Sequence, residues 1–144
     1  MEKVYIDEKT AKAKLLHSQG FNCSQSVVSA YAEELGLSRD MAEKMSVALG
    51  GGVAKMGEIC GCVSAAAVLS GFIKENQKED GSVDTLKAQT WTRDIAEKFR
   101  NECGDIVCRH LKSPRATAGR QIKPCRELVG IAARLIAEKI TSER

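Results

Sequence analysis

Apolar residues recur at spacings of three and four along almost the whole chain, and this periodicity constrains the fold more than any other feature of the sequence. Alternating runs of β-branched and aromatic residues, which are typical of strands, are absent. We therefore predict an all-α fold, a compact bundle of six or seven helices. The expected helices span about 8–18, 23–35, 38–49, 60–76, 83–103, 106–111 and 124–140.

Capping residues mark several of these boundaries. Asn22 and Gln25 form a capping box at the start of the second helix, and Gly36 follows its end. We expect Ser82 to cap the longest helix and Pro124 to be the first residue of the last one. The buried stripe of the longest helix is expected to contain Leu86, Trp91, Ile95 and Phe99.

Length and charge narrow the class of protein. A chain of 144 residues can bury a single core, so we expect one domain that spans 1–144. The net charge is only +3, from 22 basic and 19 acidic residues of alternating sign, and this balance predicts no nucleic-acid binding. The segment 115–126 is locally basic. We interpret it as a solvated loop beside the cysteines rather than as a contact with a phosphate group or a partner.

Two segments bear on location and assembly. Residues 1–9 mix both charge signs and contain no apolar stretch, so we expect neither a secretory signal nor a transit peptide and predict a cytoplasmic protein. The nearly uncharged run 59–73 is too short to span a bilayer, and it predicts a buried helix without membrane insertion. Its many small residues allow a close approach either by neighbouring helices or by the same helix of a second subunit. A homodimer is therefore one alternative that the sequence leaves open.

The chain contains six cysteines, and four of them are expected at helix starts. Free backbone N–H groups and the positive end of the helix dipole lower the pKa of a thiol there. Cytoplasmic thiols stay reduced, so such cysteines are more often catalytic, redox-sensing or metal-binding than structural. Cys103 falls at the end of a helix, where the dipole has the opposite sign, and is expected to be a bystander. The four at helix starts are Cys23, Cys60, Cys108 and Cys125.

These four cysteines are candidate catalytic residues and candidate metal ligands. Redox-cycling thiols and an iron–sulfur cluster both need thiolates and both accept them from distant segments, so the spacing leaves the two alternatives open. Zinc is less favoured, because the cysteines do not form the closely spaced pairs of a usual zinc site. Three residues adjoin the four and are candidate cofactor-binding residues: Cys62, Arg109 and Arg126.

Five segments form a pattern in order and spacing: Gly-Phe-Asn-Cys at 20–23, Gly-Gly-Gly at 50–52, Cys-Gly-Cys-Val-Ser-Ala at 60–65, Ile-Val-Cys-Arg at 106–109 and Cys-Arg-Glu-Leu-Val at 125–129. Together they resemble the C_GCAxxG_C_C family of redox-active proteins over nearly the whole chain. The chain departs from the family element at Cys62, where the family has Ala, and at Ala65, where it has Gly. The resemblance implies redox activity with a redox partner, and by analogy with related cytochromes an iron–sulfur cluster. It assigns four family cysteines: Cys23, Cys60, Cys108 and Cys125.

An alternative from a different class stays open. The chain could be a non-enzymatic binding or scaffold module, stabilised by zinc, in which the cysteines are structural. In that case replacing Cys23 or Cys125 by Ser would leave the fold and any partner affinity largely unchanged. The sequence does not decide whether the protein is an enzyme.

Overall fold

The computed structural model describes residues 2–113 and 122–143, and within these ranges it contains eight α-helices, two short 3-10 helices and no strand beyond isolated bridges. The predicted all-α fold is confirmed. The elements in chain order are α1 Glu2–Ser18, α2 Cys23–Ala30, α3 Ala32–Leu35, α4 Arg39–Ser46, η1 Val47–Leu49, α5 Gly61–Ser70, η2 Lys74–Asn76, α6 Thr85–Cys103, α7 Cys108–Leu111 and α8 Cys125–Ser142.

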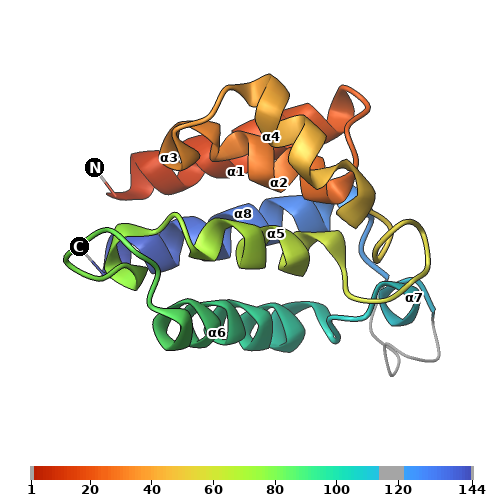
Figure 1. The fold of residues 1–144 in the computed structure, drawn as a ribbon. Helices are drawn as coiled ribbons and strands as arrows, with labels where there is room; N and C mark the ends of the chain where they lie inside the picture. Colours follow the sequence, from red (N-terminus) through yellow and green to blue (C-terminus); the bar gives the residue numbers. More distant parts are fainter. Residues whose placement is uncertain (1, 114–121, 144) are drawn as a thin grey trace.

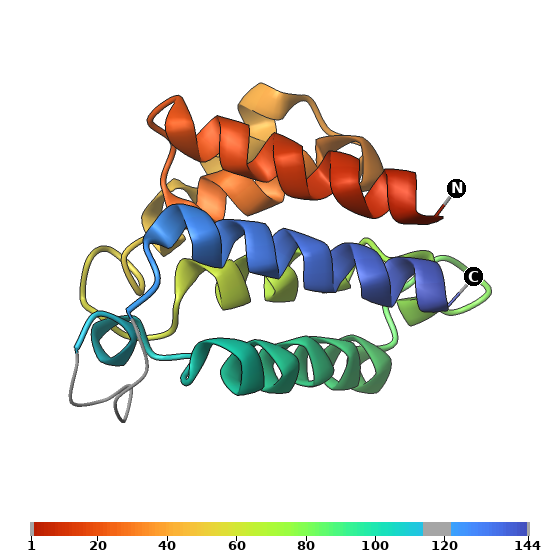
Figure 2. The same ribbon diagram turned by 180° about the vertical axis from the view of Figure 1, so that it is seen from behind.

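The helices pack in three layers. In Figures 1 and 2, α5 and α8 run through the middle of the molecule, with α1, α2 and α4 on one side and α6 on the other. The small-residue helix α5 contacts α2, α6 and α8, so it lies at the centre of the bundle and is buried as the sequence predicted. Ala65 and Ala66 are fully buried in these contacts, and they allow the close approach within one subunit.

One aromatic residue of the core, Tyr31, connects helices of two layers. Tyr31 is fully buried, and its hydroxyl donates a hydrogen bond to the carbonyl of Ala133 in α8 (2.7 Å). The backbone of Tyr31 leaves the helical region (φ −107°, ψ 18°). The single helix expected over 23–35 is therefore interrupted, because this anchored residue separates α2 from α3. Gly36 ends α3 in the left-handed conformation, as predicted.

The start of α6 differs from the prediction. Its N-cap is Asp84, whose side chain accepts a hydrogen bond from the backbone N–H of Lys87 (3.1 Å), whereas Ser82 donates to Asp80 instead (2.6 Å). Leu86 then falls in the first turn, outside the contact with α5, and its side chain is 72% exposed. The rest of the predicted stripe, Trp91, Ile95 and Phe99, is buried.

Three other boundaries differ. The helix predicted over 60–76 ends at Ser70, because the side chain of Asn76 turns back and donates to the Ser70 carbonyl (3.0 Å). The first helix begins at Glu2 rather than near residue 8, since Tyr5 reaches α3 and donates to the Glu34 carboxylate. Pro124 is the N-cap of α8 and not its first helical residue.

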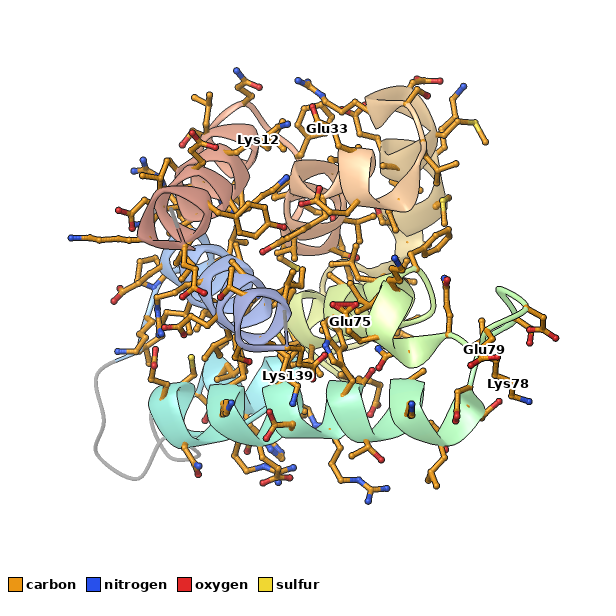
Figure 3. The ribbon with its side chains drawn as sticks, turned by 90° about the vertical axis from the view of Figure 1, so that its left-hand side faces the viewer. Lys12, Glu33, Glu75, Lys78, Glu79 and Lys139 are labelled. Carbon is orange, nitrogen blue, oxygen red and sulfur yellow. The ribbon has the colours of Figure 1, made fainter. Side chains whose placement is uncertain are left out.

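Charged side chains cover the outside of the bundle, as the alternating charge signs predicted (Figure 3). Lys139 of α8 forms an ion pair with Asp94 of α6 (3.0 Å), and Arg134 of α8 pairs with Glu102 of the same helix α6. These pairs connect the middle layer to the outer one. None of the described helices has both the length and the apolar character that crossing a membrane requires.

The exposure pattern of α6 predicts a contrast in stability. We expect Ile95→Ala to lower the free energy of unfolding by about 2–5 kcal/mol, because Ile95 is only 1% exposed and its loss leaves a cavity. Leu86→Ala, in the same helix, should change it by less than about 0.5 kcal/mol. Urea unfolding of both variants measures the difference, and equal losses would contradict the described orientation of α6.

Candidate functional site

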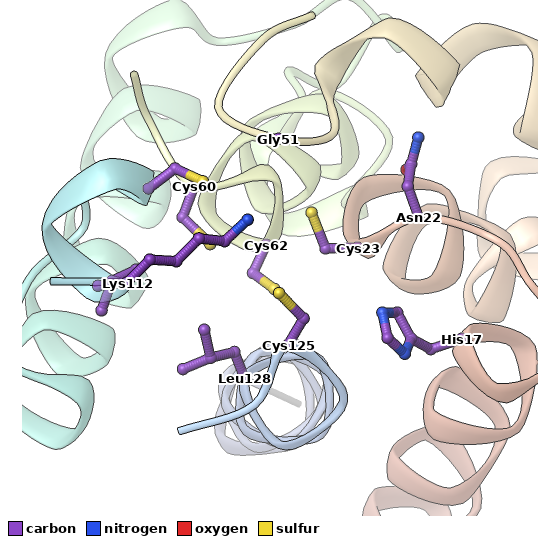
Figure 4. Close-up of a pocket in the computed structure, with 11 residues that line it drawn as sticks. His17, Asn22, Cys23, Gly51, Cys60, Cys62, Lys112, Cys125 and Leu128 are labelled. Carbon is purple, nitrogen blue, oxygen red and sulfur yellow. The ribbon is translucent and has the colours of Figure 1, made fainter. Parts of the chain in front are cut away.

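Five of the six cysteines line one cavity of about 160 Å³ at the end of the bundle where α2, α5, α7 and α8 begin (Figure 4). This end lies opposite the two chain termini (Figure 1). The cavity therefore brings together side chains from segments that are far apart in the sequence. Its lining consists of His17, Asn22, Cys23, Gly51, Cys60, Cys62, Cys108, Leu111, Lys112, Cys125 and Leu128.

Cys23 is the first residue of α2, and the predicted capping box places it. The Asn22 side chain accepts a hydrogen bond from the Gln25 N–H (2.9 Å), and the Gln25 side chain accepts one from the Asn22 N–H (3.2 Å). The Asn22 amide also donates to the carbonyl of Val47 (2.8 Å). The start of α2 is thus fixed to the segment that follows α4.

Cys60 and Cys108 are positioned by a short antiparallel pairing of two loops. Ile59 forms a bridge with Val107, the Cys60 N–H donates to Ile106 (2.8 Å), and the Cys108 N–H donates to Glu58 (2.6 Å). Cys60 is the N-cap of α5 and Cys108 is the first residue of α7. The pairing therefore sets two helix starts side by side.

The glycine of the Cys-Gly-Cys element permits a close contact between α2 and α5. A Cβ atom on Gly61 would lie 2.5 Å from the sulfur of Cys23 and 3.2 Å from the Leu49 carbonyl oxygen. Real Cβ atoms do not approach other atoms that closely, so any side chain at this position would displace Cys23. The missing side chain allows the Cys23 sulfur to lie against the first turn of α5, beside Cys62.

The glycine-rich segment forms a left-handed turn over residues 51–55. Its first two residues are glycines, but φ is also positive at Val53 (66°), Ala54 (51°) and Lys55 (64°). Such a conformation costs about 1–2 kcal/mol for each residue that has a side chain. Backbone hydrogen bonds hold the turn, among them Ala54 N–H to Ala48 O (2.7 Å). Positive φ at three consecutive non-glycine residues is a strained arrangement, and such strain is typical of functional sites.

Cys23 is an acidic thiol. Its pKa is lowered to about 6, chiefly because the Cys62 thiol donates a hydrogen bond to its sulfur. The backbone N–H groups of Gly51, Ser24 and Gly61 lower the pKa further, while burial opposes them. At neutral pH Cys23 is therefore mainly a thiolate, and its side chain is only partly buried.

The Cys62 thiol has two possible acceptors for its single hydrogen, the sulfurs of Cys23 and Cys60. The pKa of Cys60 is lowered, first by the hydrogen bond from the Cys62 thiol and also by the N–H groups of Cys62 and Val63. The pKa of Cys62 is raised well above its ordinary value, because ionisation would remove the hydrogen that it can donate to Cys23 or to Cys60, and because it is fully buried. Cys62 is thus a neutral thiol held beside an ionised one.

The expected effect of helix starts is wrong for two of the four cysteines. Burial raises the pKa of Cys108 and of Cys125, and the nearby Lys112 ammonium only partly offsets it. The helix that Cys108 starts has four residues, so its dipole is small. Cys103 lies outside the cavity lining, as a bystander would, and burial followed by the Glu102 charge raises its pKa to about 12.

Comparison with known proteins identifies the family. Residues 21–139 match the family model described as "Putative redox-active protein (C_GCAxxG_C_C)". The chain belongs to this family. A search of curated proteins and a search of solved structures each found no match.

Two arginines that were candidate cofactor ligands lie outside the cysteine cavity of this C_GCAxxG_C_C protein. Arg109 is exposed and forms an ion pair with Glu58 (3.0 Å). Arg126 is exposed in the first turn of α8. Neither is among the residues that line the cavity. Arg115 and Arg120 of the basic segment lie outside the described residues.

Two residues that line the cavity were not predicted as site residues from the sequence, His17 and Lys112. Lys112 follows Cys108 by four residues, a spacing that puts both on one face of a helical turn and could have identified it. His17 lies three residues before Gly20, in the last turn of α1. The turn that leads into Cys23 brings it to the cavity, and no local pattern indicates this.

The donor atoms of the site are those that soft metals prefer, since thiolates bind iron and zinc. Cysteines of a redox-active family are therefore compatible with a metal cofactor. Within residues 2–113 and 122–143, however, no three His, Cys, Asp or Glu side chains are grouped so that they could hold one metal ion.

The thiol pKa values predict an order of reactivity. Near pH 7 we expect limiting iodoacetamide to alkylate Cys23 before Cys103, because the pKa of Cys23 is about 6 and that of Cys103 is about 12. The Cys23 rate should rise with pH through a midpoint near 6, as its proton is lost, and then level off. Peptide mapping by mass spectrometry measures both. Labelling of Cys103 first, or a Cys23 midpoint above 8, would contradict the described environment.

A substitution on α5 tests the close contact. Gly61→Ala should displace the Cys23 sulfur and raise the midpoint of its alkylation profile by roughly one pH unit or more, because the sulfur loses its donors. Gly71→Ala is the matched control on the same helix, since its Cβ would meet only Val83 at an ordinary 3.7 Å. An unchanged midpoint in Gly61→Ala would contradict the contact.

Proposed function

We propose that this protein carries out reversible dithiol/disulfide exchange, with Cys23 as the attacking thiolate and Cys62 as the second, resolving thiol. One arrangement carries the proposal: Cys23 and Cys62 line the same cavity where the Cys23 sulfur lies against the start of α5, and the neutral Cys62 thiol lowers the pKa of Cys23 to about 6. Exchange needs a nucleophilic thiolate that a substrate can reach and a second thiol beside it. Cys23 is partly exposed in the cavity, and Cys62 is buried behind it.

The proposed exchange proceeds in two balanced steps. The Cys23 thiolate forms a bond to one sulfur of a substrate disulfide, the sulfur–sulfur bond of the substrate breaks, and one thiolate leaves. Cys62 then displaces the second substrate thiol and forms the Cys23–Cys62 disulfide. Two protein thiols are oxidised, and one disulfide is reduced to two thiols.

Cys60 has a role in the second step. Cys62 must lose its proton before it attacks, and the Cys60 sulfur accepts a hydrogen bond from it. Once Cys23 is bound in the mixed disulfide, it no longer competes for that hydrogen. The Cys60 sulfur is then the remaining acceptor for that proton.

An iron–sulfur cluster is the second candidate. The observation that favours it is that four cysteines from four separate helix starts border one cavity, where backbone N–H groups could donate to cluster sulfurs. Its ligands would be Cys23, Cys60, Cys108 and Cys125, and the cluster would supply one-electron transfer. The described sulfurs do not group around one metal ion, so we rank the cluster below exchange. Zinc ranks lower still.

The proposal includes a compartment and a partner. Exchange of this kind suits the cytoplasm, where thiol reductants could return the Cys23–Cys62 disulfide to the dithiol form. We propose that the partner is a thiol reductant of this kind and not a nucleic acid. A scaffold with structural cysteines is the rival, and it gives no reason for a thiolate at the accessible position Cys23.

Replacing the second thiol should trap the intermediate. Reduced wild-type protein treated with excess hydroxyethyl disulfide should release two equivalents of small thiol and contain a Cys23–Cys62 disulfide. Cys62→Ser should release one equivalent and keep the mixed disulfide on Cys23, because the thiol proposed to resolve it has been removed. Thiol release and peptide mass spectrometry give both quantities. Cys103→Ser is the control and should behave as the wild type.

Different outcomes separate the candidates. Release of two equivalents by Cys62→Ser would remove Cys62 from the proposed role. Anaerobically purified protein that is brown, with stoichiometric iron and acid-labile sulfide that Cys108→Ser abolishes, would support the cluster instead. Stoichiometric zinc, with no reaction of Cys23 toward disulfides, would support the scaffold.

A further inference from the structure

A second, larger cavity adjoins the cysteine cavity. It has a volume of about 760 Å³ and lies between the left-handed turn and α7. We call it the outer cavity. Small-molecule sites occupy about 300–1,000 Å³, so its size suits a small molecule. The two cavities share Asn22, Gly51, Cys108 and Lys112 in their linings, so a molecule bound in the outer cavity extends toward the sulfurs.

The outer cavity is positively charged. Three cationic side chains line it, Lys55, Arg109 and Lys112, and no Asp or Glu of the described chain lines either cavity. Arg109 is partly neutralised by Glu58 (3.0 Å). For Lys55 and Lys112 no ion pair forms with any residue that the structure describes. The cavity thus carries excess positive charge that an anion can neutralise.

The two unpaired lysines come from two different segments that line the outer cavity. Lys55 ends the left-handed turn, and its N–H donates to the Gly50 carbonyl (3.4 Å). Lys112 is the C-cap of α7, and its side chain extends toward the cysteine sulfurs (Figure 4). Lys55 lines only the outer cavity, whereas Lys112 lies where the two cavities meet.

We propose that the outer cavity binds the anionic groups of a small disulfide substrate, so that its sulfur–sulfur bond reaches Cys23. This inference rests on the dithiol exchange proposed above and names the substrate class. Cys23 bonds to the nearer sulfur of the substrate, and the electron pair of the broken bond goes to the farther sulfur, which leaves as a thiolate. Lys55 and Lys112 bind the anionic groups of the substrate, and Lys112 does so at the junction of the two cavities.

The test compares three small disulfides that are similar in length but differ in charge. Dithiodipropionate is anionic, hydroxyethyl disulfide is uncharged, and cystamine is cationic. The second-order rate constant of each with reduced protein is measured for wild type and for the Lys55→Gln, Lys112→Gln and double variants. Each disulfide is compared with itself across variants, so differences in leaving group cancel. Lys78→Gln is the matched control, because this exposed lysine lies at the opposite end of the bundle, beyond α5 (Figures 1 and 3).

We expect the double variant to react roughly 3- to 10-fold more slowly with the anionic disulfide, to be unchanged within about twofold with the uncharged one, and to react no more slowly with the cationic one. Each single variant should show part of the loss, and high salt should reduce the wild-type preference for the anion. Lys78→Gln should change none of the rates.

Two failures are distinguishable. In the first, the uncharged disulfide reacts with Cys23, but the lysine variants slow the anionic disulfide by no more than they slow the uncharged one. This inference is then wrong, and the exchange chemistry stands. If none of the three disulfides reacts with Cys23 of the wild type, the exchange chemistry itself is wrong.

Discussion

The pairing of two loops, 57–60 with 106–109, is the constraint on which the site depends. Its hydrogen bonds, from Cys60 to Ile106 and from Cys108 to Glu58, connect the start of α5 to the start of α7 across more than forty residues of intervening chain. The capping box at Asn22 and the missing side chain of Gly61 then bring the start of α2 against the start of α5. Backbone contacts, rather than the cysteines themselves, assemble the cavity.

Much of the fold could be predicted from the sequence, because helix periodicity and caps are local. The capping box at Asn22, the stop at Gly36 and the buried stripe of Trp91, Ile95 and Phe99 all depend on residues within a few positions. Some of the errors have tertiary causes. Tyr31 interrupts a helix because its hydroxyl is held by α8, a contact between residues 102 apart in the sequence.

The site was predicted in part for the same reason. A helix start can be recognised locally, so the cysteines that begin α2, α7 and α8 and cap α5 could be singled out. Their individual pKa values could not, because they depend on burial and on contacts between segments. Cys23 is acidic chiefly through Cys62, a residue of another helix, whereas burial outweighs the helix start at Cys125. Lys112 and His17 reach the cavity through tertiary placement.

The hydrogen bond between Cys62 and Cys23 has a consequence for electrochemistry. Between pH 6 and the much higher pKa of Cys62, the reduced pair holds one proton rather than two. Oxidation of this pair to a disulfide then removes two electrons and only one proton. Its midpoint potential should fall by about 30 mV per pH unit in that range, half the slope of an ordinary dithiol. A change of cellular pH would therefore shift the redox balance of this site less than that of a dithiol whose sulfurs are both protonated.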